Sequence, residues 1–286
     1  MAGTLKTTAL LQLIRFDKPI GTLLLLWPTL IALWVAAEGL PEPRLLIIFI
    51  LGTFLTRSAG CAVNDLADRK VDGSVERTSG RPLVSGNVNP QEALAFAMVL
   101  ALLAFILVLF TNPLTIMLSF IAFGVAVLYP FMKRITNMPQ LVLGLAFSFG
   151  VPMAFAATLD ALPQGLWLWF LGNLLWTVVY DTQYAMVDRD DDIEIGVKST
   201  AILFGRHDKI IIGALQVACM AMWASAGLVF SLGAPYWLAL LAIAGLFIYH
   251  QVLIRDRDRD ACFRAFLHNN RVGLVLFLGV ALSYAI

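Results

Sequence analysis

The residues best suited to chemistry in this sequence form two clusters of acidic and amide side chains. In the first cluster, Asn64, Asp68 and Asp72 follow one another at intervals of four residues. In a helix this spacing places three oxygen-bearing side chains on one face. We therefore predict that these three side chains share one face of a helix.

The second cluster contains Asp181, Asp188 and Asp192, with Tyr184 beside them. Its intervals of seven and four residues again favour one face of a helix. The two clusters follow the second and the sixth apolar stretches of the chain. They therefore occupy equivalent positions in a possible internal duplication.

Carboxylate and amide oxygens without His or Cys nearby suit a hard cation, above all Mg²⁺. Like charges on one helix face repel unless a cation neutralises them, and Mg²⁺ completes its shell with water and substrate phosphate oxygens. We therefore interpret the two clusters as a magnesium–diphosphate clamp; a merely solvated charged face is the alternative. The predicted metal ligands are Asn64, Asp68, Asp72, Asp188 and Asp192, and the four aspartates among them are the predicted catalytic residues.

Basic residues are interleaved with the acidic clusters and can meet phosphate oxygens that the metal leaves uncovered. Some of them also fit a simpler role as anchors at the inner membrane surface. The predicted diphosphate-binding residues are Arg15, Arg69, Lys70, Arg77, Arg81 and Lys198.

The composition indicates whether the protein that carries these clusters is soluble or lies in a membrane. Of the 286 residues, 60% are hydrophobic and only 14% are charged, with a mean hydropathy of +0.83. Ordinary soluble domains carry roughly 25% charged residues. The chain is therefore predicted to be a membrane protein, and nucleic-acid binding, collagen-like structure and disorder are excluded.

Apolar stretches predict an all-α polytopic protein, because a bilayer span needs about 20 largely apolar residues. We predict nine transmembrane helices within a single domain, residues 1–286. The predicted spans are 20–37, 45–63, two within 92–133, 135–159, 161–180, two within 209–255, and 272–286.

Charge placement predicts the orientation. If the N-terminus is cytoplasmic, all of the 20 Lys and Arg residues except Arg44 and Arg57 lie on the inner side, as the positive-inside rule requires. Both acidic clusters are then cytoplasmic and the C-terminus lies outside.

Arg57 falls inside a predicted span, which favours a role in a cavity or an internal pair. The alternating charges from Arg255 to Asp260 are interpreted as a solvated inner loop.

Longer strings of the sequence carry a family resemblance. Asn64-Asp65-x-x-Asp68-x-x-x-Asp72 and Asp188-x-x-x-Asp192 resemble the acidic motifs of the intramembrane aromatic prenyltransferases, the UbiA family. Other strings, such as Tyr129-Pro130-Phe131-Met132-Lys133-Arg134, resemble the bacterial 4-hydroxybenzoate branch of that family.

This resemblance implies nine helices around a central cavity that opens sideways to membrane lipid. It implies Mg²⁺-dependent transfer of a polyprenyl group from polyprenyl diphosphate to 4-hydroxybenzoate, ortho to the hydroxyl, in ubiquinone biosynthesis. It further implies a bacterial inner-membrane location, the five metal–diphosphate residues named above, and Arg134 as the residue that binds the aromatic carboxylate. As a mechanistic hypothesis, Asp188 accepts the phenolic proton.

Two alternatives remain open at the level of sequence. Another aromatic acceptor, such as a naphthoate or homogentisate, would suit the same acidic motifs. A secondary transporter is a weaker alternative, favoured by intramembrane Arg57 and the possible duplication. The acidic residues speak against transport, because they gather at one interface rather than at mid-membrane.

Overall fold

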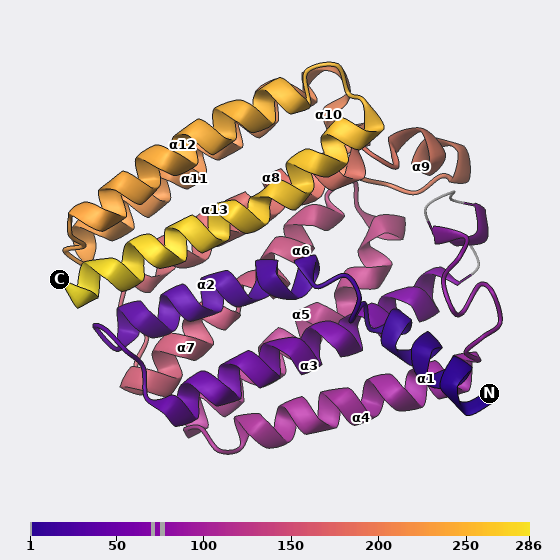
Figure 1. The fold of residues 1–286 in the computed structure, drawn as a ribbon, viewed down its shortest axis with the longest axis horizontal. Coiled ribbons are helices and arrows are strands. Elements are labelled where there is room, and N and C mark those ends of the chain that lie inside the picture. The colour runs from indigo at the N-terminus through magenta and orange to yellow at the C-terminus, as the bar shows by residue number, and fades with distance from the viewer. Residues whose placement is uncertain (1, 70–71, 75–77) are drawn as a thin grey trace.

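The computed structural model describes residues 2–69, 72–74 and 78–286. Within these residues every regular element is a helix (Figure 1). The long helices are α1 (Ala2–Leu13), α2 (Ile20–Ala36), α3 (Pro43–Asp68), α4 (Pro90–Val108), α5 (Pro113–Ile135), α6 (Pro139–Ser148), α7 (Gly150–Leu159), α8 (Leu166–Ala185), α11 (Asp208–Val229), α12 (Ala234–Leu253) and α13 (Arg259–Ala285). The short ones are η1 (Asp72–Ser74), α9 (Arg189–Ile195), α10 (Thr200–Phe204) and η3 (Gly205–His207).

Local sequence signals set where two lipid-facing helices begin. Asn89 caps α4 by accepting from the Glu92 N–H at 2.9 Å, while the Glu92 carboxylate accepts from the Asn89 N–H at 3.1 Å. The Asn112 side chain caps α5 by accepting from the Thr115 N–H at 2.9 Å. A proline at the first position of each helix adds no unsatisfied donor. The Asn112 cap and Pro113 explain the break predicted inside residues 92–133.

Neighbouring helices close into a ring. Going round it, α2 packs on α3, then α4, α5, α6, α8, α11, α12 and α13 follow, and α13 returns to α2. α7 continues the line of α6 and packs on α2. Figure 1 places the N- and C-termini at opposite ends of this bundle.

The all-α class is confirmed, whereas the count of nine spans is not. Among the described residues, seven helical segments are long and apolar enough to cross a membrane. The other two predicted spans correspond to α2, which has only 17 residues, and to α8, which has 20. In α8, polar residues such as Asn173 and Asp181 reduce the mean hydropathy.

The predicted last span, 272–286, is too short. α13 begins at Arg259 and has 27 residues, because its first turns are amphipathic rather than apolar. Arg264 and Arg271 are exposed, while Cys262 and Asn269 on the opposite side are fully buried. A search for uncharged runs misses a helix of this kind.

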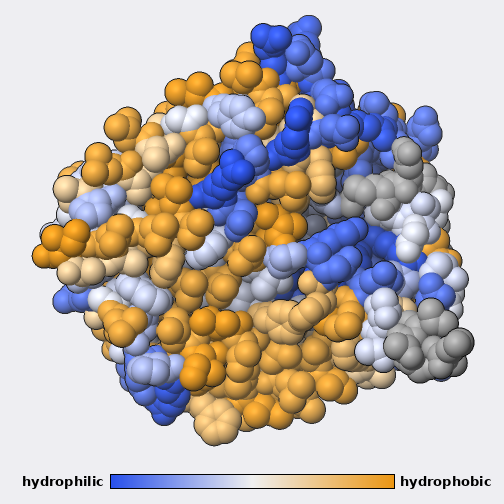
Figure 2. All heavy atoms as spheres, viewed as in Figure 1, coloured by the Kyte–Doolittle hydropathy of each residue, from blue (hydrophilic) through white to orange (hydrophobic). Residues whose placement is uncertain are grey.

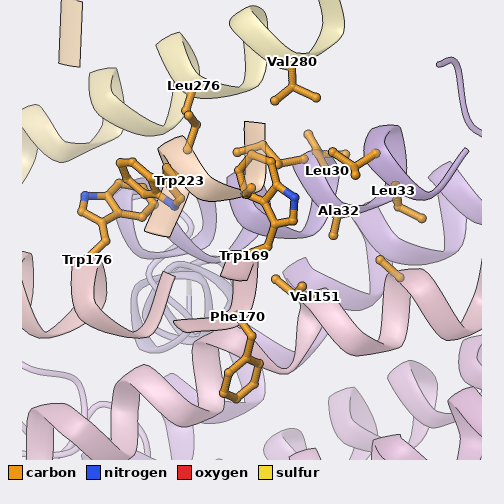
Figure 3. Close-up of a cluster of buried hydrophobic side chains, with 14 of the residues drawn as sticks. Leu30, Ala32, Leu33, Val151, Trp169, Phe170, Trp176, Trp223, Leu276 and Val280 are labelled. Atoms are coloured by element: carbon orange, nitrogen blue, oxygen red, sulfur yellow. The ribbon is translucent and has the colours of Figure 1, made fainter. Parts of the chain in front are cut away.

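Tryptophan side chains form the centre of the core between α2, α7, α8, α11 and α13 (Figure 3). Trp176 and Trp223 are almost fully buried, and their ring centroids lie 5.8 Å apart in an edge-on arrangement. The Trp176 indole N–H donates to Asn269 at 2.9 Å, and Asn269 donates to Gln183. Because buried polar groups need such partners, this network fixes how α8 and α13 pack.

The molecular surface separates lipid-facing from polar regions. α4 and α5 expose large apolar side chains such as Leu102, Phe120 and Phe123. In Figure 2 hydrophobic residues cover most of the visible face, and hydrophilic residues gather toward one end and along a hollow that leads in from it. Figure 1 shows α1 and α9 at that same end. The helices thus bring both acidic motifs to one polar end of an apolar bundle.

Candidate functional site

The first acidic motif begins on a helix and ends beyond it. Asn64 and Asp68 lie in the last turns of α3, whereas Asp72 lies in η1, after the helix has ended. The prediction of one helical face for all three residues is therefore wrong for Asp72. Arg81 Nη1 holds the Asp72 carboxylate at 2.6 Å, and the Thr78 hydroxyl donates to the Asp72 carbonyl at 2.7 Å.

The second acidic motif is also divided between two helices. α8 ends at Ala185, and Asp188 is the first residue before α9. Asp181 therefore does not share a helix with Asp192, so the predicted single face is wrong for Asp181. Asp188 and Asp192 remain one turn apart, with the Asp192 N–H donating to the Asp188 carbonyl at 2.8 Å.

Asp68 is the buried centre of the first motif. Only 1% of the residue is exposed, and its carboxylate pairs with Lys133 from the end of α5. Arg134 Nη2 lies 3.7 Å from Asp68 Oδ1 and donates to the Ala67 carbonyl. Asp68 Oδ1 accepts no hydrogen bond from any described residue.

Asp65 joins two of the predicted phosphate-binding residues. The side chain is 1% exposed and accepts two hydrogen bonds from Arg15 Nη2, at 2.7 and 3.0 Å. Arg81 Nη1 also lies 3.0 Å from Asp65 Oδ1. From the sequence alone Asp65 has no predicted role, and its position beside Asn64 in the acidic motif is the only signal that the sequence offers for it. It orients both arginines at the end of α3.

Lys198 connects the second motif to the first. The Lys198 N–H donates to the Lys133 carbonyl at 3.0 Å, and its ammonium group donates to the Ile135 carbonyl at 3.2 Å. The preceding Val197 N–H donates to the Asp192 carbonyl at 2.9 Å. A continuous path of contacts thus runs from Asp68 through Lys133 and Lys198 to Asp192.

The remaining predicted diphosphate residues are placed differently. Arg69 is exposed at the end of α3 and donates to the Leu66 carbonyl at 2.7 Å. Lys70 and Arg77 lie outside the described residues. The structure therefore brings together Arg15, Arg81, Lys133 and Lys198 around the acidic motifs, and Arg69 lies at the edge.

Arg57 lies deeper in the bundle than these residues. Its guanidinium packs against Gly21 at the start of α2, where a Cβ atom would lie 2.5 Å from Arg57 Nη2. Arg57 Nη1 donates to Cys61 Sγ, while the buried Nε has no partner among the described residues. Tyr129, Tyr180 and Tyr184 are close enough to interact with it electrostatically. This arrangement places a cationic group inside the bundle, with a buried Nε that donates to none of the described residues.

The donor set fits a magnesium ion that is shared with a substrate. Among the described residues, no three Asp, Glu, His or Cys side chains lie close enough to form a metal site by themselves. Mg²⁺ needs only one or two carboxylates when phosphate oxygens and water supply the rest. Asp68 Oδ1, which is buried and accepts no hydrogen bond from the described residues, is the oxygen best suited to such a ligand role.

Comparison with known proteins identifies the family. The family model described as the UbiA prenyltransferase family matches residues 25–278. The chain belongs to the UbiA prenyltransferase family. It is accordingly a multi-pass membrane protein, and the resemblance stated from the motifs is confirmed.

Relatives of high identity cover nearly the whole chain. A 4-hydroxybenzoate octaprenyltransferase of Aeromonas hydrophila subsp. hydrophila is 61% identical over 276 residues, which is 96% of both chains. One of Vibrio parahaemolyticus is 58% identical over 279 residues, 98% of both chains.

Solved structures show the same fold. A UbiA homologue from Aeropyrum pernix K1, solved in its apo form, superposes with a TM-score of 0.81 at 24% identity and covers 92% of this chain and 97% of its own. A homologue from Archaeoglobus fulgidus, solved bound to GPP and Mg²⁺, gives 0.75 at 16% identity and covers 97% of this chain and 100% of its own.

Proposed function

We propose that this chain transfers a polyprenyl group from polyprenyl diphosphate to the ring carbon ortho to the hydroxyl of 4-hydroxybenzoate, in ubiquinone biosynthesis. The observation that carries this proposal is the convergence of Asp68, Lys133, Arg15 and Arg81 at the polar end of an apolar bundle. The 58–61% identical relatives are named 4-hydroxybenzoate octaprenyltransferases. Their name supports 4-hydroxybenzoate as the acceptor and makes octaprenyl diphosphate the first donor to test.

The proposed metal ligands are Asn64, Asp68, Asp72, Asp188 and Asp192. When bound, Mg²⁺ supplies a Lewis acid that stabilises the negative charge of the departing diphosphate. The Archaeoglobus homologue of the same fold was solved bound to GPP and Mg²⁺, which supports the binding of a prenyl diphosphate together with Mg²⁺ here. Asp68 is the leading candidate among them, because its buried Oδ1 accepts no hydrogen bond from the described residues.

Basic residues at the same end would bind the diphosphate oxygens. Arg15 and Arg81 are both held by Asp65, so their guanidinium groups are oriented before a substrate arrives. Lys133 pairs with Asp68 and is available to exchange that carboxylate for a phosphate. Charge-assisted hydrogen bonds of this kind are short and strong. We place Lys198, Arg69, Lys70 and Arg77 in the same role as secondary contacts.

The acceptor carboxylate has two candidate partners. Arg134 is about half exposed and already donates to the Ala67 carbonyl at the rim. Arg57 lies inside the bundle, with a buried Nε that has no partner among the described residues. A planar guanidinium can bind a carboxylate through two hydrogen bonds. Arg57 is the better-placed candidate, because it would hold the ring beneath the diphosphate rather than beside solvent.

The remaining steps concern the ring and the tail. Asp188, which is largely buried before α9, is proposed to accept the phenolic proton and so make the ortho carbon more nucleophilic. The polyprenyl tail would lie along apolar helix surfaces that are open to membrane lipid. An apolar chain of this length favours such a location by about 0.8 kcal/mol for each buried CH₂ group.

A direct assay tests the proposal. Purified protein in detergent is given octaprenyl diphosphate and Mg²⁺ with 4-hydroxybenzoate, homogentisate or a dihydroxynaphthoate, and the products are identified by mass spectrometry. We expect a carbon-prenylated product with 4-hydroxybenzoate and none after chelation of Mg²⁺. Prenylation of another acceptor alone would refute the proposed substrate. Absence of transfer, with 4-hydroxybenzoate flux into proteoliposomes, would support the transporter alternative.

A further inference from the structure

The charged string from Arg255 to Asp260 connects α12 to α13. Its first two residues fit the expected solvated loop: the side chains of Arg255 and Asp256 are 74% and 76% exposed. The next three residues are engaged with the protein. Asp258 caps α13 by accepting from the Ala261 N–H at 2.8 Å, and Arg257 and Arg259 each pair with a distant aspartate. The solvated-loop prediction is therefore wrong for Arg257 and Arg259.

Arg257 binds a buried carboxylate at two points. Asp208, the first residue of α11, is fully buried. Arg257 Nε lies 2.8 Å from Asp208 Oδ2, and Nη2 lies 2.7 Å from Oδ1. Arg257 Nη2 also donates to the Arg206 carbonyl at 3.0 Å. The backbone of Arg257 has φ +57°, an uncommon conformation for a residue other than glycine, which aims the side chain at Asp208.

Two further contacts reach α9, the helix that carries Asp192. Arg259, the first residue of α13, lies 2.8 Å from Asp191. Arg189, the first residue of α9, lies 3.9 Å from Asp208. α9 is thus tied through one side chain to the start of α13 and through another to the start of α11.

α9 needs such external ties. It has only seven residues and none of them is buried, whereas isolated helices shorter than about 12 residues are marginal in water. Its own sequence therefore does not fix its orientation. The contacts of Arg189 and Asp191, together with the Lys198–Lys133 backbone bond, help to hold it over the polar end of the bundle.

We propose that the pairs Asp208–Arg257 and Asp191–Arg259, called the ionic clamp here, position α9 so that Asp188 and Asp192 face the diphosphate site. This inference rests on the proposed function, because it assigns the purpose of the clamp from the role of those two aspartates. Arg257 and Arg259 act as positioning residues for the prenyl diphosphate and its metal. The connection between α12 and α13 is thereby part of the site, although it lies far from it in sequence.

The Asp191–Arg259 pair offers the cleaner test, because loss of Arg257 would leave the buried Asp208 without its main partner and threaten folding. Arg259→Gln and Asp191→Asn each remove this pair. We expect each variant to raise the half-saturating Mg²⁺ concentration and the KM for prenyl diphosphate about fivefold, as expected for loss of about 1 kcal/mol. The KM for 4-hydroxybenzoate should not change. Arg255→Gln, a change in the same loop, is the matched control and should behave as the wild type.

If the two single variants act through the Asp191–Arg259 contact that they share, the double variant should be no worse than either alone. The charge-exchanged protein, Asp191→Arg with Arg259→Asp, should recover most of the lost affinity. Equal changes in the two KM values, additive effects, or no recovery on charge exchange would overturn the clamp.

A readout that does not depend on activity separates failure of the clamp from failure of the proposed function. Hydrogen exchange of the wild type, Arg259→Gln and Arg255→Gln is compared without substrate. We expect faster exchange confined to residues 187–198 in Arg259→Gln, with the same thermal unfolding midpoint. Unchanged exchange there overturns the clamp whether or not the protein transfers prenyl groups. Local loosening in a protein without prenyl transfer would uphold the tie to α9 and refute only the proposed function.

Discussion

At the scale of single residues, the site depends on charges that are held by partners of the opposite sign. Asp65 and Asp68 are both buried near the end of α3, and each is paired with arginine or lysine from a distant part of the chain. A buried carboxylate is tolerated only when its charge is compensated. A substrate diphosphate can compete for the same basic side chains, which leaves Asp68 available to a metal.

Substitution Asp68→Asn tests the metal role. We expect transfer to fall by about 100-fold or more, as when a preorganised charge-stabilising group is removed, while membrane insertion and expression stay normal. Product formation is measured by mass spectrometry over a range of Mg²⁺ concentrations. Asp160→Asn, at the opposite end of the bundle, is the control. Near-normal turnover in Asp68→Asn would remove this residue from the site.

Substitutions of Arg57 and Arg134 decide which residue binds the acceptor carboxylate. We expect Arg57→Gln to raise the KM for 4-hydroxybenzoate about tenfold, the loss expected for a charged hydrogen bond of about 1.4 kcal/mol. Arg134→Gln should change it less. With an uncharged phenol as acceptor, Arg57→Gln should show no such penalty. The opposite ranking of the two variants would assign the carboxylate to Arg134.

At the scale of elements, helix ends and close helix approaches place the side chains. α3 runs on to Asp68 and then ends, so Asp72 reaches the site from η1 rather than from the helix. The start of α2 approaches α3 closely at Gly21, where the absence of a side chain gives the Arg57 guanidinium its position. The role of this glycine is visible only in the packed structure.

Gly21→Ala should therefore act through Arg57. We expect a raised KM for 4-hydroxybenzoate, because the new methyl group displaces the guanidinium. Thermal stability should change little, because the helix propensity that alanine gains over glycine, about 1 kcal/mol, offsets the cost of displacing the guanidinium. Gly52→Ala in α3 is the matched control, because a Cβ there meets no atom within 4 Å. Unaltered acceptor kinetics in Gly21→Ala would show that Arg57 does not need this space.

At the scale of the whole molecule, the fold separates an apolar bundle from one polar end. The lipid-facing sides of α4 and α5 are rich in exposed apolar residues, whereas the acidic motifs, α1 and α9 lie at the same end (Figures 1 and 2). We propose, from the positive-inside rule, that this polar end with the N-terminus and the acidic motifs faces the cytoplasm of a bacterium, and that the C-terminus lies outside its inner membrane.

Fusion proteins test this orientation. Alkaline phosphatase, which is active only outside the cytoplasm, should be active when it is joined after Ile286 and inactive when it is inserted after Thr136. A fluorescent protein at the N-terminus should fold and fluoresce in the cytoplasm. The reverse pattern of phosphatase activity would invert the proposed topology.

The sequence by itself determined the helical class, most of the membrane segments and the acidic motifs. Bilayer thickness imposes long apolar runs, and caps such as Asn89 and Asn112 are local signals. It misplaced the start of α13, because the first turns of that helix are amphipathic and carry Arg264 and Arg271.

Only the tertiary structure decided which charges meet. Asp65 with Arg15, Asp68 with Lys133, and Asp191 with Arg259 each join residues at least 50 positions apart. The spacing of residues along the sequence does not reveal such ion pairs, because they form only when separate helices pack together. The same packing turned part of an apparently solvated string into contacts that hold α9, and it brought Arg57 against Gly21.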